Sequence, residues 1–370
     1  MRHQVRIGAP LQWSLRSEQG ELLLAQGQVL ADDHQLSALL VRGAFLDYAE
    51  VQSVRRIEAA AAAAVAAAPA TIFSLWEGAI WRLDRVLRGA ALEPGFPQRL
   101  DELARHVIAL TERDADIAIF LAVRQDQKRF QAYALTHALH TSKICVLMAR
   151  RIAWDAGRVV TLIKAALTMN IATLDLQGRL AAQGVPPTAV QRAQIQSHPA
   201  QGVAILRDAG VDDDEWLSAV AQHHEQPGGG GYPDGLNEVT ELALALRHAD
   251  VFIAKISPRV SRPALPAQLA ARQLYQLDKG GPMSLAIIKE FGIYPPGDLV
   301  QIKSGETAVV VRRGADAGKP TVACLTDRSG SPVTSSLRRD TSRPEHAIVS
   351  TSSDKTMVAH VLPERVYGLV

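Results

Sequence analysis

The sequence predicts a mainly α-helical protein with a small β-rich region at each end. Apolar residues recur at helical spacing from about residue 71 to about 297, whereas they alternate with polar residues near both ends of the chain. An alanine-rich stretch separates the first alternating region from the helical one. We therefore expect a β-rich N-terminal module over residues 1–56, an Ala-rich linker over 57–70, a helical domain over 71–297 and a β-rich C-terminal extension over 298–370.

The N-terminal module begins with a predicted hairpin. Residues 10–30, PLQWSLRSEQGELLLAQGQVL, alternate apolar and polar side chains on both sides of a Glu-Gln-Gly turn. A short helix should follow, because DDHQLSALLVRG starts with acidic caps and stops at Gly43. The module carries no cluster of catalytic or metal-binding residue types, so sensory, docking and packing roles stay open. The linker is expected to be partly helical, since EAAAAAAVAAAPA is rich in alanine but has almost no large side chain to bury.

The helical domain contains one segment that is apolar nearly all round, RVVTLIKAALTMNIATL, and such a helix belongs in a core. The acidic run DDDE at 212–215 supplies a cap and first-turn acids to a helix through WLSAVAQ. That helix should end near His223 and His224, beside a glycine loop. After Pro296, DLVQI and TAVVVRR flank a Ser-Gly-Glu turn, and PTVACLTD precedes another turn, which predicts the C-terminal strands.

Composition narrows the classes of partner. The 40 basic and 38 acidic side chains leave a formal charge of +2, so no global field favours DNA, RNA or an anionic membrane. The N-terminus lacks the apolar core of a secretory signal, and no run approaches the roughly 18 apolar residues of a membrane span. The two cysteines, Cys145 and Cys324, fit a reduced compartment better than a disulfide framework. We expect a cytoplasmic protein of undetermined oligomeric state.

Five potential metal ligands lie in the helical domain. Imidazoles and a carboxylate suit Mn, Fe, Zn or Ni ions, although the spacing alone leaves a metal site and a set of core histidines equally open. The loop that follows two of them has four glycines, which permit positive φ, and Pro233, which stiffens the exit and presents Tyr232. A flexible surface turn is the alternative for the glycines. The five residues are His137, His198, His223, His224 and Asp250.

The histidine pair and its loop resemble a known family. The sequence has HHE at 223–225, GYP at 231–233 and Gly-Leu at 235–236. This pattern is similar to that of the HD-GYP family, the cyclic di-GMP phosphodiesterase branch of the HD metal-dependent phosphohydrolases. The resemblance extends over roughly 130–297, through THALHTSKICVL, AALTMNIA, QIQSHPAQG, RHADVF and FGIYPPGDLVQI. It implies an HD-type helical bundle.

The resemblance also implies roles for individual residues. The family's metal ligands fall on the five residues above. His137 is preferred to His140 because the number of residues between His137 and the His-Asp position matches the spacing in the family. Arg259 and Arg262 match basic positions that hold substrate phosphate, a task that suits the guanidinium fork. Gly231 and Tyr232 belong to the ligand-binding loop of the family.

The departures from the family concern its catalytic centre. Where the family reads AALLHDIGK this chain reads AALTMNIAT, so that Met169 and Asn170 replace the His-Asp pair and no catalytic set is intact. In the family that aspartate bridges two metal ions, whereas Asn170 is neutral and the thioether of Met169 is a poor ligand for such ions. Further family positions are changed at Tyr133, Ala172, Thr173, Gly228 and Ile253.

These features predict a degenerate HD-GYP-type signalling protein with impaired catalysis. It would bind cyclic di-GMP, a related nucleotide or a protein partner in a signalling pathway. An active phosphodiesterase with an incomplete metal site and a structural docking module are the alternatives. His198, His223 and His224 could hold one divalent ion (Mn, Fe, Zn or Ni); otherwise no metal binds and the five groups form a hydrogen-bonded polar core.

Overall fold

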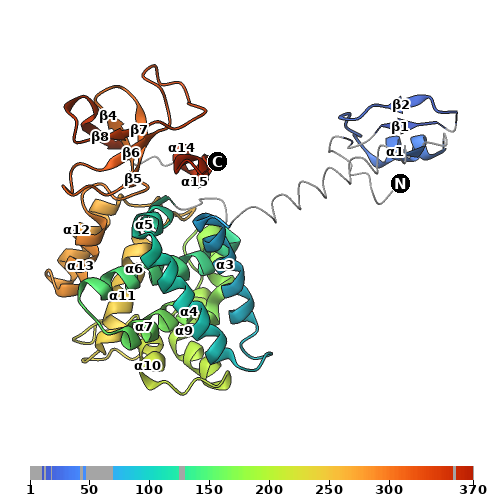
Figure 1. Cartoon of the computed structure of the whole chain (residues 1–370). Coiled ribbons are helices and arrows are strands. Elements are labelled where there is room, and N and C mark those ends of the chain that lie inside the picture. The colour runs from blue at the N-terminus through green and yellow to red at the C-terminus, as the bar shows by residue number, and fades with distance from the viewer. Residues whose placement is uncertain are drawn as a thin grey trace. The chain divides into compact units, whose positions relative to one another are not determined.

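A computed structural model describes residues 11, 14–17, 19–41, 45–46, 70–124, 130–352 and 356–369. The chain divides into two compact units, Met1–Ala70 and Thr71–Val370 (Figure 1). The predicted linker at 57–70 lies outside the described residues except for Ala70.

The described residues of the N-terminal unit form a small antiparallel sheet with one helix. Leu11, Leu15, Leu30 and Leu36 form its apolar core, which accounts for the alternation of apolar and polar residues in this part of the sequence. The predicted hairpin and short helix are both present. The strand order is β2-β1-β3, with β1 at Leu15–Arg16, β2 at Leu22–Leu24, β3 at Phe45–Leu46 and the helix α1 at Asp33–Val41.

The second unit is a helical bundle that carries a C-terminal sheet (Figure 1). This confirms the predicted fold class. The helices are α3 (Ile72–Arg88), α4 (Phe96–Arg113), α5 (Ala115–Arg124), α6 (Tyr133–Arg151), α7 (Ala156–Thr168), α8 (Leu174–Ala182), α9 (Ala189–Asp208), α10 (Asp214–Gln222), α11 (Glu241–Ile256), α12 (Ala267–Asp278) and α13 (Pro282–Phe291). Two short 3-10 helices, η1 (Phe130–Ala132) and η2 (Ile171–Thr173), precede α6 and α8.

Helix α7 lies in the core, as its apolar sequence predicts, and packs against α4, α6, α10 and α11. Its end is fixed by a hydrogen bond of 2.8 Å from Trp216 Nε1 to Thr168 Oγ1. The segment Ala156–Ala182 is long and apolar enough to cross a membrane by length and hydropathy, contrary to the expectation from the sequence. However, 72% of its apolar window is buried inside the helical bundle. Core packing therefore accounts for its composition.

The C-terminal extension is a five-stranded antiparallel sheet that docks on the helices. The predicted hairpin is present, with Gln301 paired to Thr307 across the Ser-Gly-Glu turn. Arg312 donates to both carboxylate oxygens of Asp114, at 2.9 and 2.7 Å. The strand order is β7-β6-β5-β4-β8, with β4 at Leu299–Ile302, β5 at Thr307–Arg312, β6 at Thr321–Cys324, β7 at Arg338–Asp340 and β8 at Ile348–Ser352. The 3-10 helix η3 (Pro344–His346) lies between β7 and β8, and the helices α14 (Thr356–His360) and α15 (Pro363–Val366) follow β8.

Candidate metal and phosphate site

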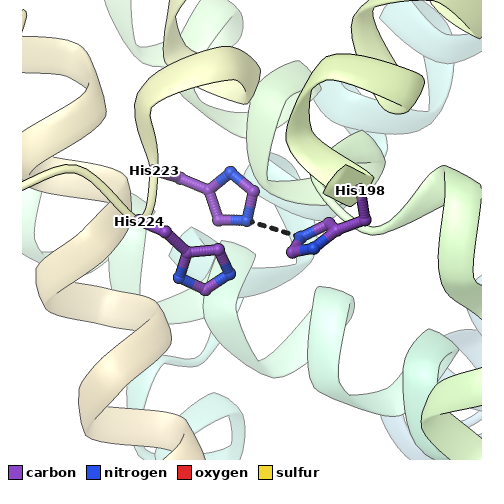
Figure 2. A group of neighbouring side chains, drawn as sticks. All are labelled: His198, His223 and His224. Carbon is purple, nitrogen blue, oxygen red and sulfur yellow. Dashed lines mark hydrogen bonds between the residues drawn. The ribbon is translucent and has the colours of Figure 1, made fainter. Parts of the chain in front are cut away.

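Two helices bring three histidines together. His198 lies on α9, and the C-terminal end of α10 places His223 and His224 opposite it (Figure 2). The acidic run predicted to start α10 does so, because Asp213 is the N-cap and its carboxylate accepts from the Trp216 N–H at 3.0 Å. The ligand nitrogens of the three rings lie within 4.8 Å of one another.

Backbone carbonyls orient two of the rings. His198 Nδ1 donates to the carbonyl of Ile195 at 2.6 Å, and His223 Nδ1 donates to that of Val220 at 2.7 Å. In a neutral imidazole this places the proton on Nδ1 and leaves a lone pair on Nε2. A hydrogen bond from the other ring nitrogen to a backbone carbonyl is the usual support of a metal-bound histidine.

The two Nε2 atoms of His198 and His223 are 3.2 Å apart (Figure 2). With both Nδ1 atoms protonated, this contact would set one lone pair against another. By contrast, two nitrogens about 2.1 Å from a single ion, at an angle of about 90 to 110°, lie roughly 3.0 to 3.4 Å apart. The spacing of these rings therefore fits one shared metal ion.

Burial keeps the three rings neutral. It lowers the pKa of His223 well below its ordinary value, with His224 and His198 acting in the same direction. Burial also lowers the pKa of His224 to about 4 and that of His198 below the ordinary range. Imidazole must be neutral to bind a metal, so no proton has to be displaced at neutral pH.

The other two predicted ligands form a pair of their own. His137 on α6 and Asp250 on α11 are both buried, and His137 Nε2 lies 2.6 Å from Asp250 Oδ1. Burial would raise the pKa of Asp250, but the hydrogen bond from His137 and the nearby imidazoles bring it below its ordinary value. Asp250 is thus an ionised carboxylate that His137 already engages.

Both residues of the pair and two of the triad, His198 and His224, line one pocket of about 230 Å³. Met169 is not among the residues that line it but is fully buried in the apolar core. Asn170 does line it. His223 is fully buried and does not line the pocket. The wall includes His137, Asn170, Thr173, Gln177, His198, His224, Tyr232, Asp250 and Arg259.

Only one of the two predicted phosphate-binding arginines faces this pocket. Arg259 lines it, and its Nε donates to the hydroxyl of Tyr133 at 3.2 Å. Its guanidinium also lies 5.2 Å from the centre of the Tyr133 ring, within the range of a cation–π contact. Arg262 is exposed and donates instead to the carbonyl of Ala254.

A buried glutamate organises the glycine loop. Glu225 is fully buried, and its carboxylate accepts from the backbone N–H groups of Asp234, Gly235 and Leu236 at 2.7 to 3.1 Å. At Gly231 a Cβ atom would lie 2.3 Å from Glu225 Cα, so only glycine fits there. The loop in turn holds Tyr232 stacked on His224, with ring centres 4.5 Å apart. It is a packed element and not the flexible turn considered as the alternative.

Some wall residues were not anticipated from the sequence. The sequence identifies Thr173 only as a departure from the family and gives no signal for Gln177. They lie one turn apart, around the start of α8, and both face the pocket with Asn170. The HHE motif does not by itself predict the role of Glu225, although a carboxylate followed by a glycine-rich turn is a recognisable acceptor for loop N–H groups.

Comparisons with known proteins give one family match and two similar proteins. Residues 101–279 match a protein family described as HD domain. A cyclic di-GMP phosphodiesterase of Pseudomonas aeruginosa is 25% identical over 190 residues, which cover 50% of this chain and 46% of that protein. The chain therefore matches less than half the length of this relative. An HDG"Y"P protein from Bdellovibrio bacteriovorus has a solved structure with a TM-score of 0.47 and 15% identity, covering 77% of this chain and 96% of that one.

Proposed function

We propose that this HD-domain protein, a distant relative of a cyclic di-GMP phosphodiesterase, holds one divalent metal ion and binds a cyclic dinucleotide with impaired hydrolysis. The ion would be bound by His198, His223 and His224. The observation that carries the proposal is the 3.2 Å separation of two Nε2 atoms whose partner Nδ1 protons are engaged by backbone carbonyls.

The charge of the pocket supports one ion and not two. Two dications about 4 Å apart repel by roughly 17 kcal/mol at an effective dielectric constant of about 20, so a metal pair needs anionic ligands between its members. Asp250 is the one carboxylate among the described residues that line the pocket, and His137 already donates to it. Asn170 adds an amide without charge. The donor set therefore favours a single ion.

The remaining wall residues suit a phosphodiester. A bound divalent ion supplies an electrophilic centre for a phosphoryl oxygen. Arg259 adds a guanidinium that Tyr133 orients, and arginine binds phosphate through paired N–H groups. The volume of about 230 Å³ lies below the roughly 300 to 1,000 Å³ of pockets that enclose a drug-sized ligand. The pocket would thus take one phosphodiester group, with the bases of the dinucleotide outside it.

Hydrolysis with a single metal is the second candidate. A three-histidine set leaves a coordination position free, as catalytic zinc sites do. The ionised Asp250 lines the same pocket and could accept a proton. These two features favour a slow phosphodiesterase over a purely structural docking module.

Metal content and nucleotide binding test the proposal together. The purified chain would be loaded with Mn, Fe, Zn or Ni, analysed by mass spectrometry for metal, titrated with cyclic di-GMP and assayed for its hydrolysis. We expect about one metal ion per chain, saturable nucleotide binding and no turnover above background. Turnover at an ordinary enzymatic rate would support the second candidate, and absence of both metal and nucleotide binding would leave the docking module.

Matched variants locate the site. His223→Ala should lose the metal, and Arg259→Met should keep the metal but weaken nucleotide binding. His248 provides the control, because its Nδ1 also lies 2.6 Å from a backbone carbonyl, that of Leu244, while its Nε2 is near Asp278 and not the triad. His248→Ala should retain both metal and nucleotide. Equal metal content in His223→Ala and wild type would refute the assignment.

A further inference from the structure

A second and larger pocket, of about 760 Å³, lies between α3, α5, α6 and the C-terminal segment. It shares Tyr133 with the site described above but contains none of the three triad histidines. Its volume falls within the range of pockets that enclose small organic ligands. The proposed function makes no use of it.

Lys143 supplies the inner polar end of this pocket. Its side chain lies on α6, and the residue is only 3% exposed. The Nζ atom lies 4.1 Å from the centre of the Trp76 ring and 3.2 Å from His140 Nδ1. No carboxylate forms an ion pair with it in the described part of the chain. Burial lowers the pKa of Lys143 to about 7, as expected for an ammonium group without a counter-ion.

His140 adds a second donor at the same end. Burial and the neighbouring Lys143 hold the pKa of His140 well below its ordinary value, so the ring is neutral. When Lys143 donates to Nδ1, the remaining proton of the ring is on Nε2. The inner end of the pocket therefore offers N–H groups and a potential cation, and among the described residues no carboxylate forms an ion pair with Lys143.

Most of the remaining wall is apolar and aromatic. It includes Phe73, Ile80, Leu121, Phe130 and Leu139. Trp81 also lines the pocket and is 69% exposed, although a large aromatic side chain favours burial. The carboxylate side chain of Glu77 lines the pocket as well, but this residue is exposed to solvent.

We propose that this pocket binds a small, mostly apolar organic monoanion, whose acidic group pairs with Lys143 and His140 while its apolar part packs on the aromatic wall. The anion would provide the counter-charge that the buried amine lacks. Occupancy would cover part of the exposed Trp81 ring. The site is separate from the metal site, so its test does not depend on metal or nucleotide binding.

A carboxylate and its isosteric amide test the role of charge. The full chain would be titrated with 2-naphthylacetate and 2-naphthylacetamide by calorimetry, at one pH and ionic strength. We expect the carboxylate to bind at least tenfold more tightly than the amide. Lys143→Met should remove this preference, while His223→Ala should keep it. Failure of the carboxylate to bind at millimolar concentration, or equal binding of the two compounds to wild type, would overturn the proposal.

Substitutions at Gly78 test whether the carboxylate probe binds in this pocket, and they remove no polar group. It lies on α3 and lines the pocket, and a Cβ atom there would meet nothing within 4 Å. Gly78→Phe should fill the pocket and reduce carboxylate binding at least tenfold, whereas Gly78→Ala should leave it unchanged. Retained binding in a folded Gly78→Phe protein would show that the probe binds elsewhere.

Discussion

Two backbone carbonyls, those of Ile195 and Val220, determine which nitrogen of His198 and His223 is free to bind a ligand. The effect is local, because each carbonyl belongs to the residue three positions earlier in the chain. Together with burial, which keeps the rings neutral, it makes the Nε2 lone pairs of a mid-helix histidine and a helix-end histidine converge. The metal proposal depends on this detail more than on the number of histidines.

Asn170 is the residue whose charge should limit metal binding. It lines the pocket with His198, His224 and Asp250, so a carboxylate in its place would face the same ion. Asn170→Asp is expected to raise the affinity for a divalent ion by about tenfold, or roughly 1.4 kcal/mol. Competition with a chelating dye would measure the change. Asn170→Ser is the neutral control, and equal affinity in all three proteins would contradict the one-ion account.

Lys143 should make stability depend on pH. Its pKa is about 7 in the folded chain against 10.5 for an ordinary lysine. Between these values the unfolded chain holds a proton that the folded chain lacks, so the free energy of unfolding rises with pH through this window. Lys143→Met removes the free-energy cost of deprotonating the buried amine on folding. We expect this variant to gain roughly 3 to 5 kcal/mol over wild type at pH 6, with the gain shrinking towards pH 10.

Urea unfolding at several pH values would measure this effect. Lys289→Met is the control, because Lys289 is exposed and its replacement should leave the pH profile of wild type unchanged. A constant difference between Lys143→Met and wild type from pH 6 to 10 would contradict the prediction. The other titratable side chains that line the same pocket are Glu77, Arg124, Tyr133, His140, His360 and Glu364.

At the scale of elements, the loop after α10 shows how a short motif becomes a packed structure. The Glu225 carboxylate accepts hydrogen bonds from three backbone N–H groups, and Gly231 lies against the backbone of Glu225. Gly228 and Gly229 have φ of +86° and +83°, as the sequence suggested, whereas Gly231 is needed for close approach and not for positive φ. The loop then presents Tyr232 to His224.

Two neighbouring glycines provide a matched test of this loop. Gly231→Ala would force a Cβ atom to within 2.3 Å of backbone, whereas at Gly230 the nearest atom would be Gln226 Cβ at 3.9 Å. We expect Gly231→Ala to lose about 1 to 3 kcal/mol of stability and to weaken nucleotide binding. Gly230→Ala should stay within about 0.5 kcal/mol of wild type. Equal melting temperatures for the two variants would show that the loop adapts without cost.

The same elements show what the sequence could predict. Helix caps and apolar periodicity are local, so α7, α10 and the C-terminal hairpin follow from them. The direction in which a single side chain points is harder to predict, because the side chains of successive residues in a helix point about 100° apart. Met169 therefore faces the core while Asn170 faces the pocket, and Arg262 turns to a carbonyl while Arg259 turns to the site.

At the scale of the whole molecule, the C-terminal extension and the helical bundle form one unit. Arg312 pairs with Asp114, and Tyr367 packs on Phe73 with ring centres 5.3 Å apart. The segment after α14 also forms part of the larger pocket. None of this was predictable from the sequence, because each contact joins residues far apart in the chain. The helical domain thus carries two pockets that meet at Tyr133.

An anomalous-difference map from a crystal of the metal-loaded protein, collected at the absorption edge of the ion, tests the central claim most directly. The account predicts one peak, about 2.1 Å from ligand nitrogens of His198, His223 and His224. A second peak of similar height between Asn170 and Asp250 would contradict the one-ion assignment. An empty triad in crystals soaked at saturating Mn, Fe, Zn and Ni would contradict the metal site itself.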